Sequence, residues 1–376
     1  MPGTGISLHA STKKRARLIE KKRAPAEELT PFSSDELRVI EQALAKRRGS
    51  MNFILPENAG AADFSDVQFD HATFFSGYVF DISTFSNATF YYAEFDGATF
   101  VSWADFQFAT FSGHADFKGT TFCDPAIFEG ATFAFSVEFD GATFVSWAGF
   151  DGTTFSSHDS HVGFIFPQSF AGARFQESSS FVNAEVQGPP SFEGAIFETE
   201  PPQFFAAKLH QETVWRGVDW PKPKDAKTAG TFLDAYACLK LEMDRLKKYE
   251  EELDFFALEL QSRRALLGWR GWPIWLYGVL SGYSRSYVRP LVAMFIVVAI
   301  GAVAVWYFDA RTCGEGLGLS AANTLNVFGF RKDFFDAAVI ECLPAPLKIL
   351  SAVQTILGAI LLFLFGLGVR NKFRMK

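Results

Sequence analysis

Large apolar residues recur at a fixed spacing in the first half of the chain. From residue 64 to residue 155, a phenylalanine recurs every five or six positions, and from Phe95 onward the two steps alternate strictly. The repeating unit is therefore eleven residues, and Phe95–Phe106 returns almost unchanged as Phe139–Phe150. Because apolar periods of 3.6 and 2 do not produce this spacing, neither an α-helix nor a flat strand explains it. The pattern predicts a coil whose sides are each five or six residues long.

The residues beside each phenylalanine also follow a rule. The residue two positions earlier is usually alanine, as at Ala98, Ala104 and Ala115, and the residue between is polar, as at Asp105 and Asp116. Residues two apart in an extended segment point the same way, so alanine and phenylalanine are predicted to face inward and the polar residue outward. Glycine recurs at one turn position, where a positive φ is useful. The glycines at this position are Gly97, Gly119, Gly130, Gly141 and Gly152.

These A-T-F and A-D-F units resemble the pentapeptide-repeat family, in which A-(D/N)-L-x-x units wind into a right-handed quadrilateral β-helix. The resemblance covers roughly residues 64–220 and is interrupted by an insertion after Phe155. With about 22 residues in each turn, Phe95 should stack on Phe117, and Phe117 should be buried. The same displacement stacks Glu94, Asp116 and Glu138 into an acidic outer column, our candidate protein-interaction face. Asp116 should be exposed, and Lys118 should lie between Asp96 and Asp140.

Charge divides the chain into segments. Residues 1–50 hold 11 Lys/Arg against 6 Asp/Glu, whereas residues 51–220 hold 4 against 22 and residues 221–376 hold 20 against 14. We therefore expect a basic flexible arm with a short helix at 1–50 and the β-helix at 51–220. A linker and one long amphipathic helix, roughly 231–267, should occupy 221–268. That helix can pack on the end of the rod or pair with a second copy.

The last segment, 269–376, is predicted to be membrane-bound. Tryptophan, tyrosine and arginine mix over 269–289, as is typical of a lipid headgroup boundary. Two uncharged runs follow, and they predict transmembrane helices at about 290–308 and 348–369. Nine basic residues flank the spans, against four in the loop between them, which favours a two-pass inner-membrane protein with both termini in the cytoplasm.

The loop between the spans carries the candidate transport residues. Val327, Phe328, Gly329 and Phe330 lie where two-span ion channels place their filter, but a potassium-type filter uses more glycine. Cys313 and Cys342 can form a disulfide or remain two free thiols. Gln354 and Thr355 within the second span should face another helix, which favours a homo-oligomer.

Nothing in the sequence predicts an enzyme, a cofactor or a catalytic residue. His158, Asp159 and His161 form the densest group of metal-ligand types, but they lie in the polar insertion without matching ligands, so a solvated bulge is favoured over a metal site. Three functions remain. The first is a membrane-anchored scaffold whose acidic rod binds a cytoplasmic protein, and the second is a two-span channel-like protein or sensor with a regulatory β-helix. The third and least favoured is a DNA-mimicking protein; binding to nucleic acid itself is not favoured.

Overall fold

The computed structural model describes most of the chain after residue 51. The described residues are 52–54, 62–66, 68–77, 79–80, 83–156, 168–309, 313–326, 329, 331, 335 and 343–374. They form two compact units, the first extending to Pro223 and including Asp234–Leu246, and the second made of Lys224–Leu233 and the rest. The predicted helix of the N-terminal arm and the insertion with His158, Asp159 and His161 lie outside the described residues.

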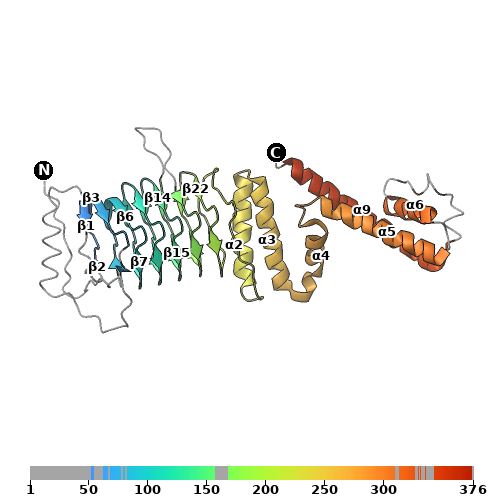
Figure 1. Ribbon diagram of the computed structural model, residues 1–376, viewed down its shortest axis with the longest axis horizontal. Helices are drawn as coiled ribbons and strands as arrows, with labels where there is room; N and C mark the ends of the chain where they lie inside the picture. Colours follow the sequence, from blue (N-terminus) through green and yellow to red (C-terminus); the bar gives the residue numbers. More distant parts are fainter. Residues whose placement is uncertain are drawn as a thin grey trace. The chain divides into compact units, whose positions relative to one another are not determined.

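The first unit contains a β-solenoid of short, parallel strands (Figure 1). One sheet consists of β2 (Ala62–Asp63), β5 (Ser83–Thr84), β8 (Ala104–Asp105), β12 (Ala126–Ile127), β16 (Ala148–Gly149) and β20 (Ser179–Ser180). A second consists of β4 (Val79–Phe80), β7 (Thr99–Phe100), β11 (Thr121–Phe122), β15 (Thr143–Phe144), β19 (Arg174–Phe175) and β23 (Ile196–Phe197). The largest sheet consists of β1 (Asn52–Ile54), β3 (Gln68–Phe74), β6 (Thr89–Glu94), β9 (Thr110–Phe111), β10 (Ala115–Asp116), β13 (Thr132–Phe133), β14 (Val137–Glu138), β17 (Thr154–Phe155), β18 (Gln168–Ser169), β21 (Glu185–Val186) and β22 (Pro190–Ser191).

Stacked aromatic rings fill the interior of the solenoid. Phe117 is completely buried, as predicted, and its ring stacks 4.8 Å from that of Phe95 above and 4.8 Å from that of Phe139 below. The alanines two positions earlier are buried beside the rings, so large and small side chains alternate in a narrow core. One position departs from the expected phase: Phe75, rather than Phe74, stacks on Phe95. The predicted repeat-built β-solenoid is confirmed.

Larger aromatic residues close the C-terminal end of the solenoid. Trp215 stacks on Phe192 with ring centroids 4.7 Å apart, and Trp220 stacks on Phe197. Helix α2 (Ala229–Arg245) supplies Tyr236, whose ring meets Trp220 edge-on and whose hydroxyl donates a hydrogen bond to the carbonyl oxygen of Pro221. This part of α2 therefore packs on the end of the rod.

The prediction of a single helix over 231–267 is wrong. The structure has two helices, α2 and α3 (Tyr249–Leu267), separated by a turn in which Lys247 takes a φ of 60°. No glycine or proline marks this break. Arg245 donates hydrogen bonds to Glu242 and to the carbonyl oxygen of Leu209, so contacts with the solenoid hold the end of α2 in place.

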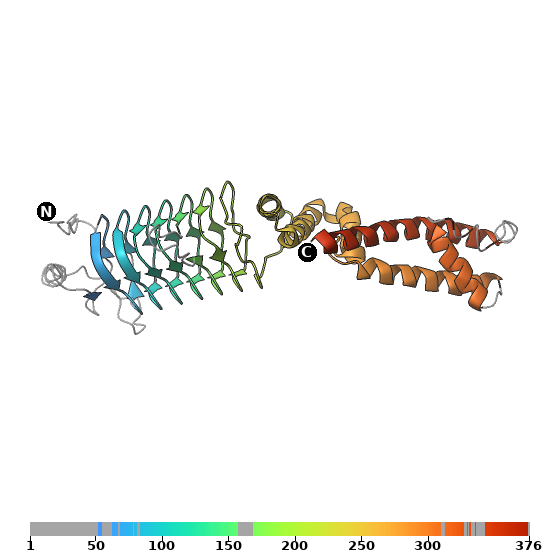
Figure 2. The same ribbon diagram turned by 90° about the horizontal axis from the view of Figure 1, so that it is seen from above.

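The second unit carries two apolar helices that are long enough to cross a bilayer. After the 3-10 turn η1 (Gly268–Gly271) and α4 (Trp272–Ser281) come α5 (Val288–Asp309), α6 (Cys313–Thr324) and α9 (Ala345–Arg374). Helices α5 and α9 meet the length and hydropathy expected of membrane spans, and α9 extends beyond the predicted 348–369 at both ends. Figure 2 shows α5 and α9 side by side, and α6 packs against both.

Candidate functional site

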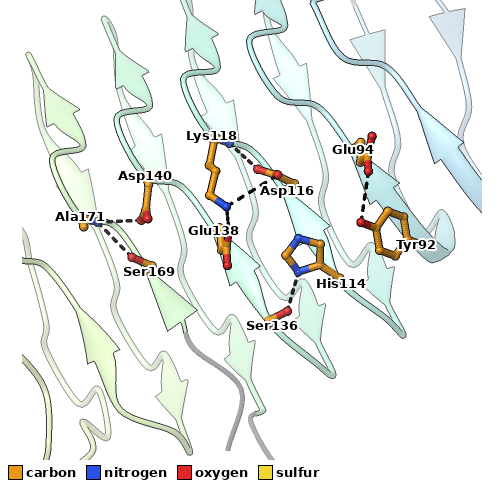
Figure 3. A network of polar contacts seen from close by, with 10 residues as sticks. All are labelled: Tyr92, Glu94, His114, Asp116, Lys118, Ser136, Glu138, Asp140, Ser169 and Ala171. Carbon is orange, nitrogen blue, oxygen red and sulfur yellow. Dashed lines mark hydrogen bonds and ion pairs between the residues drawn. The ribbon is translucent and has the colours of Figure 1, made fainter.

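The predicted acidic column exists in the register of the large sheet. Strand β10 pairs in parallel with β6 and β14, so Asp116 lies opposite Glu94 on one side and Glu138 on the other (Figure 3). The prediction that Asp116 is exposed is wrong, since its side chain retains only 18% of its accessible surface. Neighbouring turns lie so close that each outward side chain covers part of the next.

Lys118 neutralises part of this column. Its ammonium contacts the carboxylate of Glu138 and lies 4.0 Å from that of Asp116. Its backbone does lie between those of Asp96 and Asp140, as predicted, because the N–H of Gly97 donates to the carbonyl oxygen of Lys118 and the N–H of Gly119 donates to that of Asp140. Its side chain does not pair with Asp140, which instead accepts a hydrogen bond from the backbone N–H of Ala171. A flexible lysine reaches the column beside its own because two carboxylates there repel each other unless a cation lies between them.

Two of the acidic residues also support the solenoid itself. Asp116 accepts a hydrogen bond of 2.8 Å from the backbone N–H of Lys118, which stabilises the turn that follows β10. Glu94 accepts one of 3.1 Å from the hydroxyl of Tyr92. The column is therefore partly structural, and only the oxygens without these contacts are available to a partner.

His114 lies beside the column and raises the question of a metal site. One ligand atom each from His114, Asp116 and Glu138 lie within 4.8 Å of one another. The Lys118 ammonium already contacts both carboxylates, so the charge that a metal ion would supply is present, and the residues do not fit a metal site well. Burial lowers the pKa of His114, although the nearby Asp116 opposes this, and Nδ1 shares a hydrogen bond with Ser136.

Every basic residue of segment 51–220 is paired with an acidic residue of a neighbouring turn. The segment has four such residues, Lys118, Arg174, Lys208 and Arg216. Arg174 pairs with Glu198 at 2.5 Å, Lys208 with Glu185 at 3.6 Å and Arg216 with Glu193 at 3.5 Å. Since 22 acidic residues stand against these four, the excess negative charge of the solenoid has no internal counterpart.

Most of the candidate transport residues in the loop lie outside the part of the chain that the structure describes. Val327, Phe328, Phe330, Cys342 and the side chain of Cys313 lie outside the described residues, which leaves the disulfide a prediction. Gly329 is described, and its φ of 82° is a conformation that favours glycine.

The sequence did not predict that α6 packs against both α5 and α9. Ser320 donates to the carbonyl oxygen of Val298 in α5 and accepts a 2.7 Å hydrogen bond from Gln354 in α9. Thr355 donates to the carbonyl oxygen of Asn323. Gln354 and Thr355 therefore find their partners within the same chain, which removes their support for a homo-oligomer.

Glycines make the close approach of α6 possible. A Cβ atom added to Gly358 would lie 1.8 Å from the carbonyl oxygen of Thr324, and one added to Gly301 would lie 2.3 Å from the Ser320 hydroxyl. Small residues at helix contacts in a membrane are a signal that could have revealed this packing from sequence.

Comparison with known proteins agrees with the repeat. Residues 101–143 match the family model described as pentapeptide repeats (9 copies). Among solved structures, the chain is similar to trypsin-treated QnrB1, described as a plasmid-mediated fluoroquinolone resistance protein, with 18% identity, a TM-score of 0.19, and coverage of 48% of this chain and 92% of QnrB1. A search of curated proteins finds no match. Residues 101–143 of the solenoid are therefore pentapeptide repeats, and the same stacking of phenylalanines continues on both sides of that stretch.

Proposed function

We propose that this protein is a non-enzymatic, membrane-anchored scaffold whose solenoid binds a basic protein in the cytoplasm. The observation that carries the proposal is the pairing of all four basic residues of segment 51–220 within the solenoid, while 22 acidic residues share the same segment. A surface with this excess attracts a basic partner over a long range, which speeds association and makes it sensitive to salt.

The anchor in this proposal is the pair α5 and α9. Their lengths suit a hydrocarbon layer of about 30 Å. The bias of basic residues toward the flanks of the spans supports an inner-membrane protein with both termini, and hence the solenoid, on the cytoplasmic side.

Capture of a cytoplasmic protein by the detergent-solubilised full-length chain tests the scaffold. A partner should bind at low salt and dissociate as ionic strength rises. Glu94→Gln together with Asp96→Asn should slow its association, because the long-range attraction depends on the total charge of the solenoid. Glu250→Gln serves as a matched control, because it removes a charge on α3, outside the solenoid. Equal capture by all variants at every salt concentration would remove the electrostatic basis of the proposal.

The packing of α6 favours a second candidate, a channel-like protein. A helix of 12 residues that lies between two spans, with Ser320, Asn323 and Gln354 buried among apolar residues, is an arrangement suited to a pore loop. This function needs several copies around one axis. An ion-selective current in planar bilayers that disappears with Gly329→Ala would favour the channel over the anchor. If the intact protein passes no current, the channel is excluded and the scaffold is retained.

A further inference from the structure

Phe108 has a backbone conformation that does not suit its side chain. Its φ is 55°, in the left-handed region that large side chains rarely adopt. The corresponding position of the other turns holds smaller residues, which are Asp66, Asn87, Gly130, Gly152, Asn183 and, in the last turn, Ala206. A bulky residue in a strained conformation is often retained for a purpose other than stability.

The ring of Phe108 is also poorly covered. Its side chain lies over Gly130, where an added Cβ atom would come within 2.5 Å of the ring, yet 62% of its surface remains accessible. Phe108 thus differs from the phenylalanines of the core, because it is placed on the outside of the rod.

Other apolar side chains occupy the same outer face of the sheet that contains β8, β12 and β16. Trp103, directly before β8, is 51% exposed. Ile127 holds the outward position that Asp105 holds one turn earlier, but its side chain is buried, with only 9% exposed. The ring of Trp147 lies over Gly149, the register partner of Ile127, since an added Cβ there would come within 2.3 Å of it.

Acidic groups lie between these apolar side chains. Glu129 is held by a 3.0 Å hydrogen bond from Gln107, and Asp105 accepts hydrogen bonds from Ser86 and from the backbone of Gln107. Both carboxylates are fixed in place and partly exposed. This combination of aromatic anchors and fixed negative charge matches a partner segment with apolar and basic residues.

We infer that this surface, which we call the Trp103–Phe108 face (Trp103, Asp105, Phe108, Glu129 and Trp147), binds a basic amphipathic helix of the partner. The inference rests on the proposed scaffold function and assigns its binding site to a face other than the acidic column of Glu94, Asp116 and Glu138. Apolar residues of the helix cover Trp103 and Phe108, and its lysines or arginines lie against Asp105 and Glu129.

The test uses the full-length protein in phosphatidylcholine nanodiscs and two synthetic peptides. One is an amphipathic helix of leucine and lysine, and the other has glutamine in place of each leucine; titrations into protein-free nanodiscs are subtracted. The leucine peptide should bind more tightly. Phe108→Gly should weaken it roughly tenfold, as the loss of one aromatic anchor does. Because glycine suits the backbone at this position, the same variant should keep or raise the unfolding temperature.

Tyr91→Ser is the matched control. Tyr91 is also 62% exposed, but it lies in β6 of the large sheet. It should leave peptide binding unchanged. Equal binding of both peptides, or binding unaffected by Phe108→Gly, would overturn the inference. If both peptides bind equally and their binding weakens with salt, this inference fails while the scaffold proposal stands. If neither peptide binds at any salt concentration, both fail.

Discussion

The rings of Phe95 and Phe117 stack with their centroids 4.8 Å apart and their planes within 4° of each other. The parallel register that produces this stack also places Glu94 opposite Asp116 on the outer surface. One geometric relationship therefore sets both the core and the surface of the solenoid, because each turn repeats the one before it.

Removing one ring from the stack should destabilise the solenoid strongly. Phe117→Ala should lower the free energy of unfolding by ~3–5 kcal/mol, through lost burial and the cavity left between Phe95 and Phe139. Asp96→Ala, an exposed neighbouring position, should change it by less than about 0.5 kcal/mol. Urea unfolding followed by circular dichroism measures both, and equal midpoints would show that Phe117 does not face the core.

Asp116 should matter for stability despite its place in a repulsive column. Asp116→Ala removes the acceptor for the Lys118 N–H and should cost about 1 kcal/mol. Asp116→Asn keeps an oxygen at that place and should recover most of the loss. If the alanine variant were instead as stable as the wild type, repulsion within the column would outweigh the turn hydrogen bond.

The stability of the solenoid should fall in mild acid because of His114. Burial lowers the pKa of His114 below its ordinary value of about 6.5, so the unfolded chain binds the proton more readily. The stability that comes from keeping His114 unprotonated is fully present above pH 6.5, the ordinary pKa, and is lost as the pH falls through the lowered pKa of the folded state. The unfolding temperature at pH 7.5 and at pH 5 measures it. His114→Asn, which can still bond to Ser136, should show a smaller decrease, and an identical decrease would assign the effect to other groups.

The docking of α6 should depend on one glycine and not on another in the same helix. Gly358→Ala should lower the unfolding temperature of the second unit, since the new methyl group meets the carbonyl oxygen of Thr324. Gly366→Ala has open space around it and should be tolerated. Thermal unfolding in detergent compares the two, and similar temperatures would mean that α6 is not packed this closely.

The topology can be tested by labelling intact cells. Two exposed positions suit the labelling: Gly314→Cys, in open space at the start of α6, and Phe373→Cys, near the end of α9. In a background where the native cysteines are replaced by serine, an impermeant maleimide should label only position 314. Labelling of position 373 alone would invert the orientation inferred from the basic residues.

Much of the solenoid could be predicted because its information is local and repeated. The spacing of Phe95, Phe117 and Phe139 gives the length of a turn, and the intervening polar residues give the outer columns. The shift from Phe74 to Phe75 could not be predicted, because two adjacent phenylalanines satisfy the pattern equally and only the packing against Phe95 distinguishes them. The break at Lys247 likewise has no local signal, since contacts with the solenoid hold the end of α2.

By itself, the sequence determined the repeat, the sign of the surface charge and the two apolar spans, since these depend on periodicity and composition. The tertiary structure decided where individual polar groups find partners. Lys118 reaches Glu138 rather than Asp140, and Gln354 reaches Ser320 of its own chain rather than a second copy. Such pairings depend on distances of a few ångströms between residues that are far apart in sequence. A long side chain can contact any of several partners within that range, so the sequence alone does not determine which pair forms.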